Sequence, residues 1–167
     1  MKNILKFEEY INELLETSIP FELEYFEGAR RWVGEFDSPS GMNYNLDCQD
    51  MDPRPGLKPN QVTFGVQFYA LDSDGKYVLG LTNNKEAYAV LTTVVKICRE
   101  VIKRERRNIV RFTFTGTPRD GEDATEATSR ARIYRVLINK MLPSATIEED
   151  GNSTLVTVVK GNMVKKN

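Results

Sequence analysis

The sequence predicts an α+β domain built on a mixed, mostly antiparallel sheet flanked by helices. Short segments with alternating apolar residues fill much of the first half of the chain, as antiparallel strands do. In the second half, amphipathic helices alternate with strands, and this order implies right-handed crossovers onto a partly parallel sheet. The length of 167 residues suits a single domain over residues 1–167.

The chain is expected to begin with a helix within residues 1–20. Apolar side chains in NILKFEEYINELLE recur at three and four positions, and Pro20 ends the pattern. The next segment, FELEYFE, alternates apolar and acidic residues, which predicts a strand. Gly28 marks a turn into a second strand, RRWVGEF, whose main candidate for burial is Trp32.

Residues 38–60 have a different character, because they hold four of the seven prolines. This region is expected to be mostly loop, with no more than a short strand at Met42–Leu46. The following segment, QVTFGVQFYAL, alternates apolar residues and predicts a long strand. A turn at Asp72–Gly75 then returns the chain as the second strand of a hairpin, at Tyr77–Leu79.

The clearest helix lies in NNKEAYAVLTTVVKICREVIKRE, where apolar residues trace one continuous stripe. Cys98 falls on that stripe and is expected to be an inert core thiol. Asn83, with Glu86 three residues later, can act as a capping box at the start. Basic residues gather at the C-terminal end, where cations interact favourably with the helix dipole.

The last part of the chain alternates strands and a second helix. The segment RNIVRFTFTGT predicts a strand, and a polar loop leads from it into the helix TSRARIYRVLINKM, residues 128–141. Two strands at Ala145–Glu149 and Thr154–Lys160, joined by a turn, are expected to complete the fold. Residues 161–167 should form a frayed tail.

Composition excludes several kinds of chemistry. The chain has no histidine, which excludes Ser-His-Asp and Cys-His nucleophiles and zinc sites built on imidazole. No apolar run approaches the roughly 20 residues that span a bilayer, so no membrane association is expected. Carboxylates near the N-terminus and only two cysteines favour a cytoplasmic protein. Cys48 lies in a predicted acidic loop, where neighbouring charge disfavours its thiolate.

The formal net charge of −1 is unevenly distributed. Residues 1–60 carry 12 Asp and Glu against 6 Lys and Arg, whereas residues 96–140 carry 12 Lys and Arg against 6 Asp and Glu. The two halves either neutralise each other in the fold or present a basic face to a nucleic acid or an acidic partner. The candidate nucleic-acid-binding residues are Arg99, Lys103, Arg106, Arg107 and Arg111. Binding through phosphates would depend strongly on salt.

Three aspartates in the proline-rich region are candidate ligands for a metal ion. Asp47, Asp50 and Asp52 lie close together there and offer the oxygen ligands that hard cations prefer. Their spacing matches no calcium-binding loop. No metal site is therefore predicted.

The element order over residues 60–160, with Ser129 and the pair Ile133-Tyr134 in the last helix, resembles the GNAT acetyltransferase fold. This resemblance implies a GNAT-like core, acetyl-CoA as cofactor, and a general-acid role for Tyr134 toward the departing CoA thiolate. GNAT enzymes hold the cofactor pyrophosphate on a Gly-rich turn that starts the long helix. The corresponding segment here is LGLTNNKEAYAV, where no second glycine or arginine accompanies Gly80. The sequence therefore favours a GNAT-like fold without a cofactor.

Three segments, LTNNKEAYAVLTTVVKIC, NIVRFTFTG and TSRARIYRVLINKM, resemble a group of small, uncharacterised tailed-phage proteins. The resemblance implies a phage accessory protein, located in the host cytoplasm or on the virion. We expect this protein to be non-enzymatic and to bind a host or phage macromolecule, with a protein as the first candidate partner.

Arg130 is a further candidate, because it shares the buried stripe of its helix with Tyr134 and lies near the positive end of the helix dipole. Two interpretations are open. Arg130 and Ser129 could form an anion or ligand pocket with the strand end at Thr115-Gly116. Alternatively, Arg130 forms an internal ion pair with an acidic residue of the N-terminal half.

Overall fold

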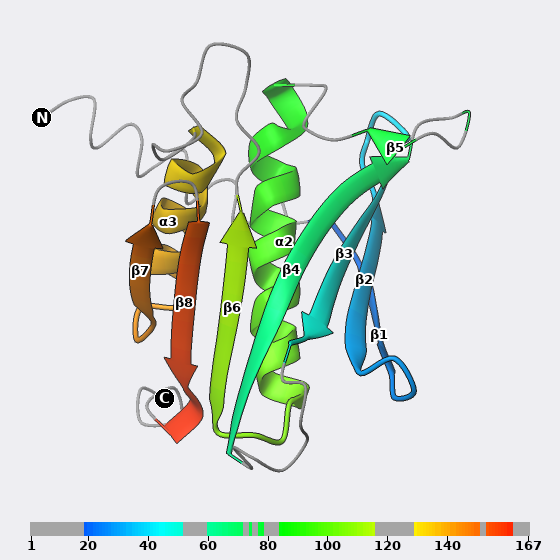
Figure 1. Ribbon diagram of the computed structural model, residues 1–167. Helices are drawn as coiled ribbons and strands as arrows, with labels where there is room; N and C mark the ends of the chain where they lie inside the picture. The colour runs from blue at the N-terminus through cyan, green and yellow to red at the C-terminus, as the bar shows by residue number, and fades with distance from the viewer. Residues whose placement is uncertain are drawn as a thin grey trace, which may run out of the picture.

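The computed structural model describes residues 19–51, 60–71, 74, 77–78, 84–115, 129–150 and 153–161, which form one sheet with two helices against it (Figure 1). The strands are β1 Glu22–Phe26, β2 Arg31–Asp37, β3 Asn43–Asp50, β4 Gln61–Leu71, β5 Tyr77–Val78, β6 Ile109–Thr115, β7 Thr146–Asp150 and β8 Ser153–Val159, and the helices are α2 Asn84–Arg104 and α3 Ser129–Met141. The predicted helix within residues 1–20 and the tail after Gly161 lie outside the described residues.

The strand order confirms an α+β fold with a mixed, mostly antiparallel sheet. In the described residues the order is β1-β2-β3-β4-β6-β8-β7, and the short β5 pairs with β4. β4 and β6 are parallel and are connected through α2, whereas every other described pair is antiparallel. β8 lies between β6 and β7 and pairs with both. The predicted partly parallel sheet is therefore present.

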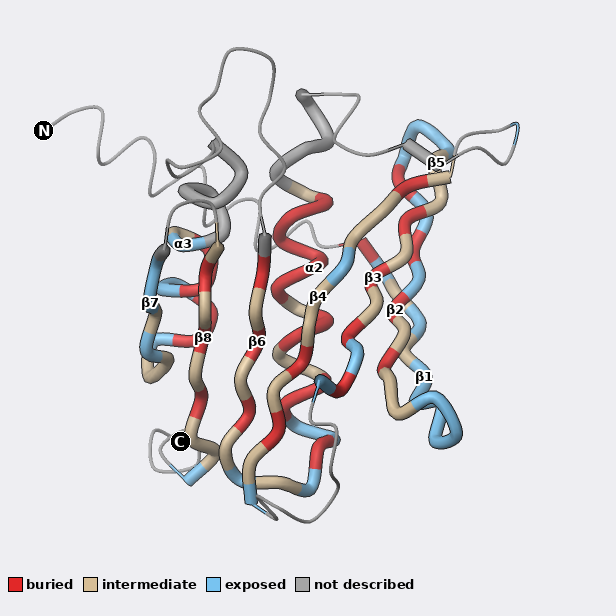
Figure 2. The backbone as a smooth tube through the Cα atoms, viewed as in Figure 1, coloured by how far each residue is buried: buried red, intermediate tan, exposed pale blue. Residues whose placement is uncertain are grey.

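The two described helices occupy the same face of the sheet. Figure 1 shows α2 and α3 side by side behind the strands, and no described helix covers the front. Burial follows this arrangement, because the strands alternate between buried and less buried residues while α2 is buried along most of its length (Figure 2). The expectation of flanking helices thus holds for one face of the sheet within the described residues.

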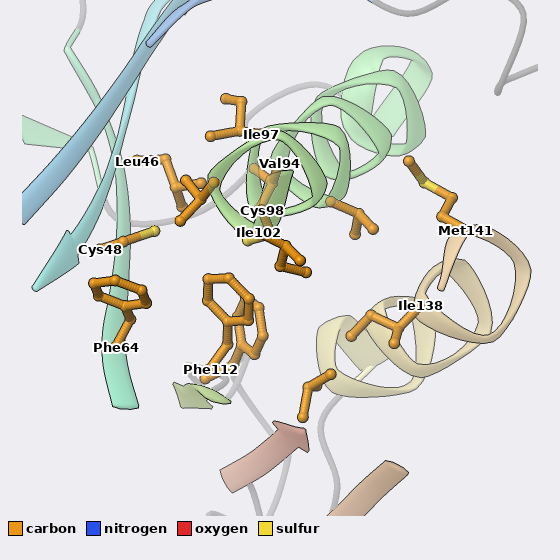
Figure 3. Packing of buried hydrophobic residues seen from close by; sticks show 14 of the residues in the cluster. Leu46, Cys48, Phe64, Val94, Ile97, Cys98, Ile102, Phe112, Ile138 and Met141 are labelled. Atoms are coloured by element: carbon orange, nitrogen blue, oxygen red, sulfur yellow. The ribbon is translucent and has the colours of Figure 1, made fainter. Parts of the chain in front are cut away.

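The hydrophobic core lies between the two helices and the sheet (Figure 3). Alternation places Phe64 of β4 and Phe112 of β6 on the helix side, with their ring centroids 5.8 Å apart. α2 packs tightly on the sheet at Gly34 of β2, where a Cβ would lie 2.8 Å from Cγ2 of Ile97. Glycine is thus needed for this close approach.

α2 is buried more widely than one apolar stripe would require. Thr92 and Thr93 are as fully buried as the apolar residues beside them. The Thr93 hydroxyl donates to the Ala89 carbonyl at 2.7 Å and accepts from the Ile19 amide at 3.3 Å. This arrangement satisfies the Thr93 hydroxyl inside the core and ties the chain before β1 to α2.

β1 forms one edge of the sheet within the described residues. The guanidinium Nη1 of Arg104, at the end of α2, donates to the outward-facing carbonyl of Leu23 in β1 at 3.2 Å. Arg104 also pairs with Glu100 on its own helix, at 3.2 Å. The basic end of α2 therefore bonds to the edge strand, in addition to its favourable interaction with the helix dipole.

The sequence interpretation of residues 38–60 needs one correction. β3 spans the eight residues Asn43–Asp50, not a short strand at Met42–Leu46, and it pairs with both β2 and β4. The prolines lie outside it, so every inner amide of β3 is available for pairing. Cys48 is consequently a buried strand residue that faces α2, and not part of an acidic loop.

Candidate functional site

The residues of the predicted anion pocket are only partly described. α3 begins at Ser129, and β6 ends at Thr115, at the same end of the sheet (Figure 1). The side chains of Thr115, Ser129, Arg130 and Tyr134, and the whole of Gly116, lie outside the described part of the chain. The pocket and the general-acid role of Tyr134 therefore stay predictions.

The five basic residues of the nucleic-acid interpretation do not share one surface. Arg99 and Lys103 point away from the sheet on α2, and Arg106 is exposed just after the helix ends. Arg111 lies on β6 and points to the opposite side of the sheet, because its neighbours on the strand face the helices. Arg107 lies on neither of these two surfaces, because its guanidinium is bonded within an internal network.

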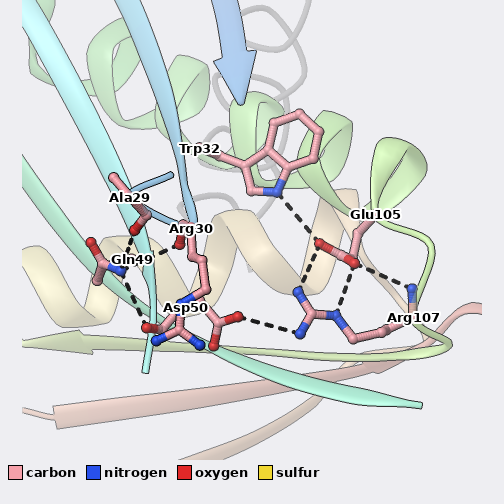
Figure 4. A network of polar contacts seen from close by, with 7 residues as sticks. All are labelled: Ala29, Arg30, Trp32, Gln49, Asp50, Glu105 and Arg107. Carbon is pink, nitrogen blue, oxygen red and sulfur yellow. Dashed lines mark hydrogen bonds and ion pairs between the residues drawn. The ribbon is translucent and has the colours of Figure 1, made fainter. Parts of the chain in front are cut away.

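That internal network joins Arg107 to two buried carboxylates (Figure 4). Nε of Arg107 donates to Oε1 of Glu105 at 3.0 Å, and Nη1 donates to Oδ2 of Asp50 at 3.3 Å. Oε2 of Glu105 also accepts from the indole N–H of Trp32 at 3.5 Å. Glu105 and Asp50 are 5% and 7% exposed, so both charges depend on these partners.

The network shifts the pKa values of its members. Burial alone raises the pKa of Glu105, but hydrogen bonds from Arg107, and a further one from Trp32, outweigh it and hold that pKa below its ordinary value. Burial works against the charge of Arg107, but the two carboxylates outweigh it and raise the pKa of Arg107. Lys160 donates its ammonium group to the Glu105 carbonyl. The network thus fixes the connection between α2 and β6.

A second group of polar residues lies on the side of the sheet that faces away from α2 and α3, which we call the open face. Nη1 of Arg31 pairs with Oδ2 of Asp47 at 3.1 Å. The Asn43 amide donates to Glu35 and Asp37, at 2.9 Å in each case. Nε of Arg31 and Oδ1 of Asp47 are inaccessible and have no partner among the described residues. These polar contacts are therefore incomplete, unlike those around Arg107.

The β1–β3 part of the open face is acidic. Its acidic side chains are Glu22, Glu24, Glu35, Asp37 and Asp47, and its only described basic side chain is Arg31. Glu22 and Glu35 stand directly opposite each other on neighbouring strands. Like charges in that position are mildly destabilising.

Two large apolar side chains are exposed on the same face. Phe26 is 42% exposed, and the Arg31 guanidinium lies 5.9 Å from the centre of its ring. Met51, just after β3, is 57% exposed and lies over Gly65, where its sulfur is 2.8 Å from the place of a Cβ. Phe26, Arg31 and Met51 therefore form a row across the open face, which we call the central row.

The two cysteines meet between the sheet and α2. Figure 3 shows the sulfur of Cys48, on β3, directed toward Cys98 on α2. A hydrogen bond to the Cys98 thiol and burial both raise the pKa of Cys48. The prediction that Cys98 is a buried core thiol is confirmed, and Cys48 shares that environment. Both thiols are poor nucleophiles in the folded protein.

Other features of the described residues bear on ligand, metal and membrane sites. A shallow hollow between α3 and β7 is lined by Arg135, Asn139, Ala145, Ile147 and Glu149. Asp47 and Asp50 point to opposite sides of β3, Asp52 is not described, and no metal-binding cluster is found in the described ranges. None of the described helices is long and apolar enough to cross a membrane.

Comparison with known proteins adds no relationship to this geometry. No protein-family model matches the chain, and no curated protein or solved structure matches it.

Sequence reasoning found the basic residues of α2 but missed the open face and the internal network. Phe26 and Met51 each looked like an ordinary apolar residue, because nothing local tells which face of a strand stays uncovered. One signal was present for Asp50. It continues the alternation of Tyr44, Leu46 and Cys48, which places a carboxylate on the buried side and requires a cationic partner.

Proposed function

We propose that this chain is a non-enzymatic accessory protein of a tailed phage that binds a host or phage macromolecule on the open face. The observation that carries the proposal is the central row, in which Phe26, beside Arg31, and Met51 are exposed on a sheet face that no described helix covers. Aromatic, Met and Arg side chains are enriched in protein–protein interfaces and supply much of their binding energy. The polar residues around the row would form the rim of such an interface.

The order of strands supports a GNAT-like core for this protein. A single parallel pair, β4 with β6, follows an antiparallel run, and β8 inserts between β6 and β7. The segment LGLTNNKEAYAV, which leads into α2, lacks the paired glycines that let a pyrophosphate approach the backbone. The proposal therefore assigns no cofactor to this core.

One experiment tests the absence of a cofactor directly. Isothermal titration of the full chain with acetyl-CoA should give no heat of binding. Micromolar affinity would overturn the proposal in favour of an acetyltransferase.

A second experiment tests the open face. The double variant Phe26→Ser, Met51→Ser removes two apolar side chains from the surface that would contact the partner. Its affinity for any partner that the wild type retains from phage-infected cells should fall roughly tenfold, which corresponds to about 1.4 kcal/mol. The matched control is Asn139→Ser, which changes an exposed residue of α3 outside both proposed binding surfaces. Equal retention by the double variant and the wild type would remove the open face from the proposal.

An acyl-CoA-dependent N-acetyltransferase is the second candidate function. The pairing of β4 with β6 ends at Val66 and Phe114, while β4 continues to Leu71 away from β6. α2 and α3 both begin at that end of the sheet (Figure 1), and helix N-termini favour anions. If acetyl-CoA binds, Tyr134→Phe should lower kcat by about 10²-fold or more without a matching change in cofactor affinity.

A further inference from the structure

The β1–β3 part of the open face and the outer side of the helices carry opposite charges within the described residues. The open face of β1–β3 has five carboxylates and one arginine, as given above. On the helix side, Arg99 and Lys103 point outward on α2, and Arg106, just after α2, and Lys140, near the end of α3, are basic too; we call these four residues the basic patch. The carboxylate of Glu100 beside them is paired with Arg104. The uneven charge of the sequence therefore becomes a difference between two surfaces.

These two surfaces cannot neutralise each other within one chain. The sheet and the helix layer separate them, so the charged ends on one surface cannot reach the other. Within the described residues, the ion pairs inside the fold include Arg107 with Asp50 and Arg104 with Glu100. The charges on the two described surfaces can therefore attract an external partner.

The helix side of a second copy has the chemistry and the shape to cover the open face. A pair of helices aligned with the strands is the usual cover of a sheet face. Long Lys and Arg stems can pack on apolar groups such as Phe26 and Met51, as Arg31 already does over Phe26. Their charged ends would reach the carboxylates around the central row.

We propose that the open face of one copy docks on the basic patch of a second copy, so that the chain assembles head to tail. This inference rests on the proposed function and names its macromolecule as another copy of the chain. Open face against open face is disfavoured, since it would bring like charges together. A head-to-tail contact uses two different surfaces and leaves one of each free, so it extends beyond a dimer unless the rotation closes a ring.

The contact is expected to be weak and sensitive to salt. Three strands about 4.8 Å apart and about seven residues long present a footprint of roughly 300 Å². A standard interface covers about 800 Å² per partner. Exposed charge pairs contribute little each and are screened by salt. Assembly should therefore appear at high protein concentration and low ionic strength.

Sedimentation velocity of the full chain tests the proposal. At about 0.05 M salt the weight-average mass should rise with concentration above the 19.1 kDa of one chain, and at about 0.5 M salt it should return to that value. A mass that stays at one chain under all these conditions would overturn the inference. A mass that rises equally at both ionic strengths would overturn it too.

Charge-swap variants identify the two surfaces. Glu35→Lys with Asp37→Lys removes the net negative charge of the open face of β1–β3, and Lys103→Glu with Arg106→Glu removes the net positive charge of the basic patch. Each double variant alone should be monomeric, because one of its two surfaces no longer attracts the other. An equimolar mixture keeps one wild-type contact, between the open face of the basic-patch variant and the basic patch of the open-face variant, and should form heterodimers. Glu148→Lys changes a carboxylate on β7, at the opposite edge of the sheet from the acidic β1–β3 region, and as the control it should assemble as the wild type does.

Two outcomes separate this inference from the proposed function. If the wild type is monomeric but the Phe26→Ser, Met51→Ser variant still loses a different partner, self-assembly is wrong and the open face remains the binding surface. If the basic patch variant instead loses salt-sensitive retention on DNA while the wild type is monomeric, the patch binds nucleic acid and the inference is overturned.

Discussion

The two arginine–carboxylate groups of this protein are made of the same side chains but lie in different surroundings. Arg107 is enclosed between β3 and the connection from α2 to β6, and it bonds to both Glu105 and Asp50. Arg31 lies on the open face, 42% exposed, and bonds to Asp47 alone. Charged pairs therefore have two roles in this fold. Enclosed pairs hold elements together, whereas pairs on the open face remain accessible to a partner.

The largest expected effect comes from breaking the enclosed pair. Arg107→Ala should lower the free energy of unfolding by about 3–5 kcal/mol, because it removes a cation that pairs with two buried carboxylates. Chemical denaturation at neutral pH measures this loss. A loss below about 1 kcal/mol would mean that the network is hydrated and not enclosed.

Two glycines differ in the same way, because one lies against a buried side chain and the other against an exposed one. A Cβ on Gly34 would meet the fully buried Ile97 at 2.8 Å, and a Cβ on Gly65 would meet the exposed Met51 at the same distance. Gly34→Ala should cost about 1–3 kcal/mol through overpacking. Gly65→Ala should stay within about 0.5 kcal/mol of the wild type, since Met51 can move into solvent. Thermal or chemical unfolding of both variants decides the matter.

The open-face pair should contribute little to folding. Arg31→Ala is expected to change the free energy of unfolding by no more than about 1 kcal/mol, because the arginine is 42% exposed and solvent screens its pair with Asp47. Its effect on partner binding should be larger than its effect on stability. The reverse result, a stability loss equal to that of Arg107→Ala, would contradict the distinction between the two groups.

The smallest expected effect is a change in the pH dependence of stability. The pKa of Glu105 is held below its ordinary value in the folded protein, so its contribution is complete above the ordinary carboxyl pKa. That contribution is lost as the pH falls through the lowered pKa. Glu105→Gln should therefore lose less stability than the wild type between about pH 7 and about pH 3. Glu148→Gln, an exposed carboxylate on β7, is the control and should follow the wild type.

The elements with a clear repeat were predictable from the sequence. The long apolar stripe predicted α2, and the alternation after residue 60 predicted β4. The alternating order of helices and strands predicted a partly parallel sheet, which β4 and β6 provide. These features depend on local periodicity, and local periodicity is what a single sequence displays.

The missed features depend on contacts between distant residues. β3 was underestimated because prolines surround it, although none interrupts Asn43–Asp50. Asp50 and Arg107 are 57 positions apart, and no local pattern pairs them. The open face could not be predicted either, since it depends on both described helices choosing the same side of the sheet.

The hydrogen bond from Arg104 to the Leu23 carbonyl bears on how this protein avoids aggregation. An uncovered edge strand offers a ladder of backbone groups to any passing extended chain, and amyloid-like stacking begins there. The Arg104 guanidinium donates to one of these backbone groups, the Leu23 carbonyl oxygen, at 3.2 Å and places a positive charge at the edge of the sheet. An incoming strand would have to displace it before pairing with β1. Strand addition at this edge is thus disfavoured, while the sheet face that no described helix covers is unaffected.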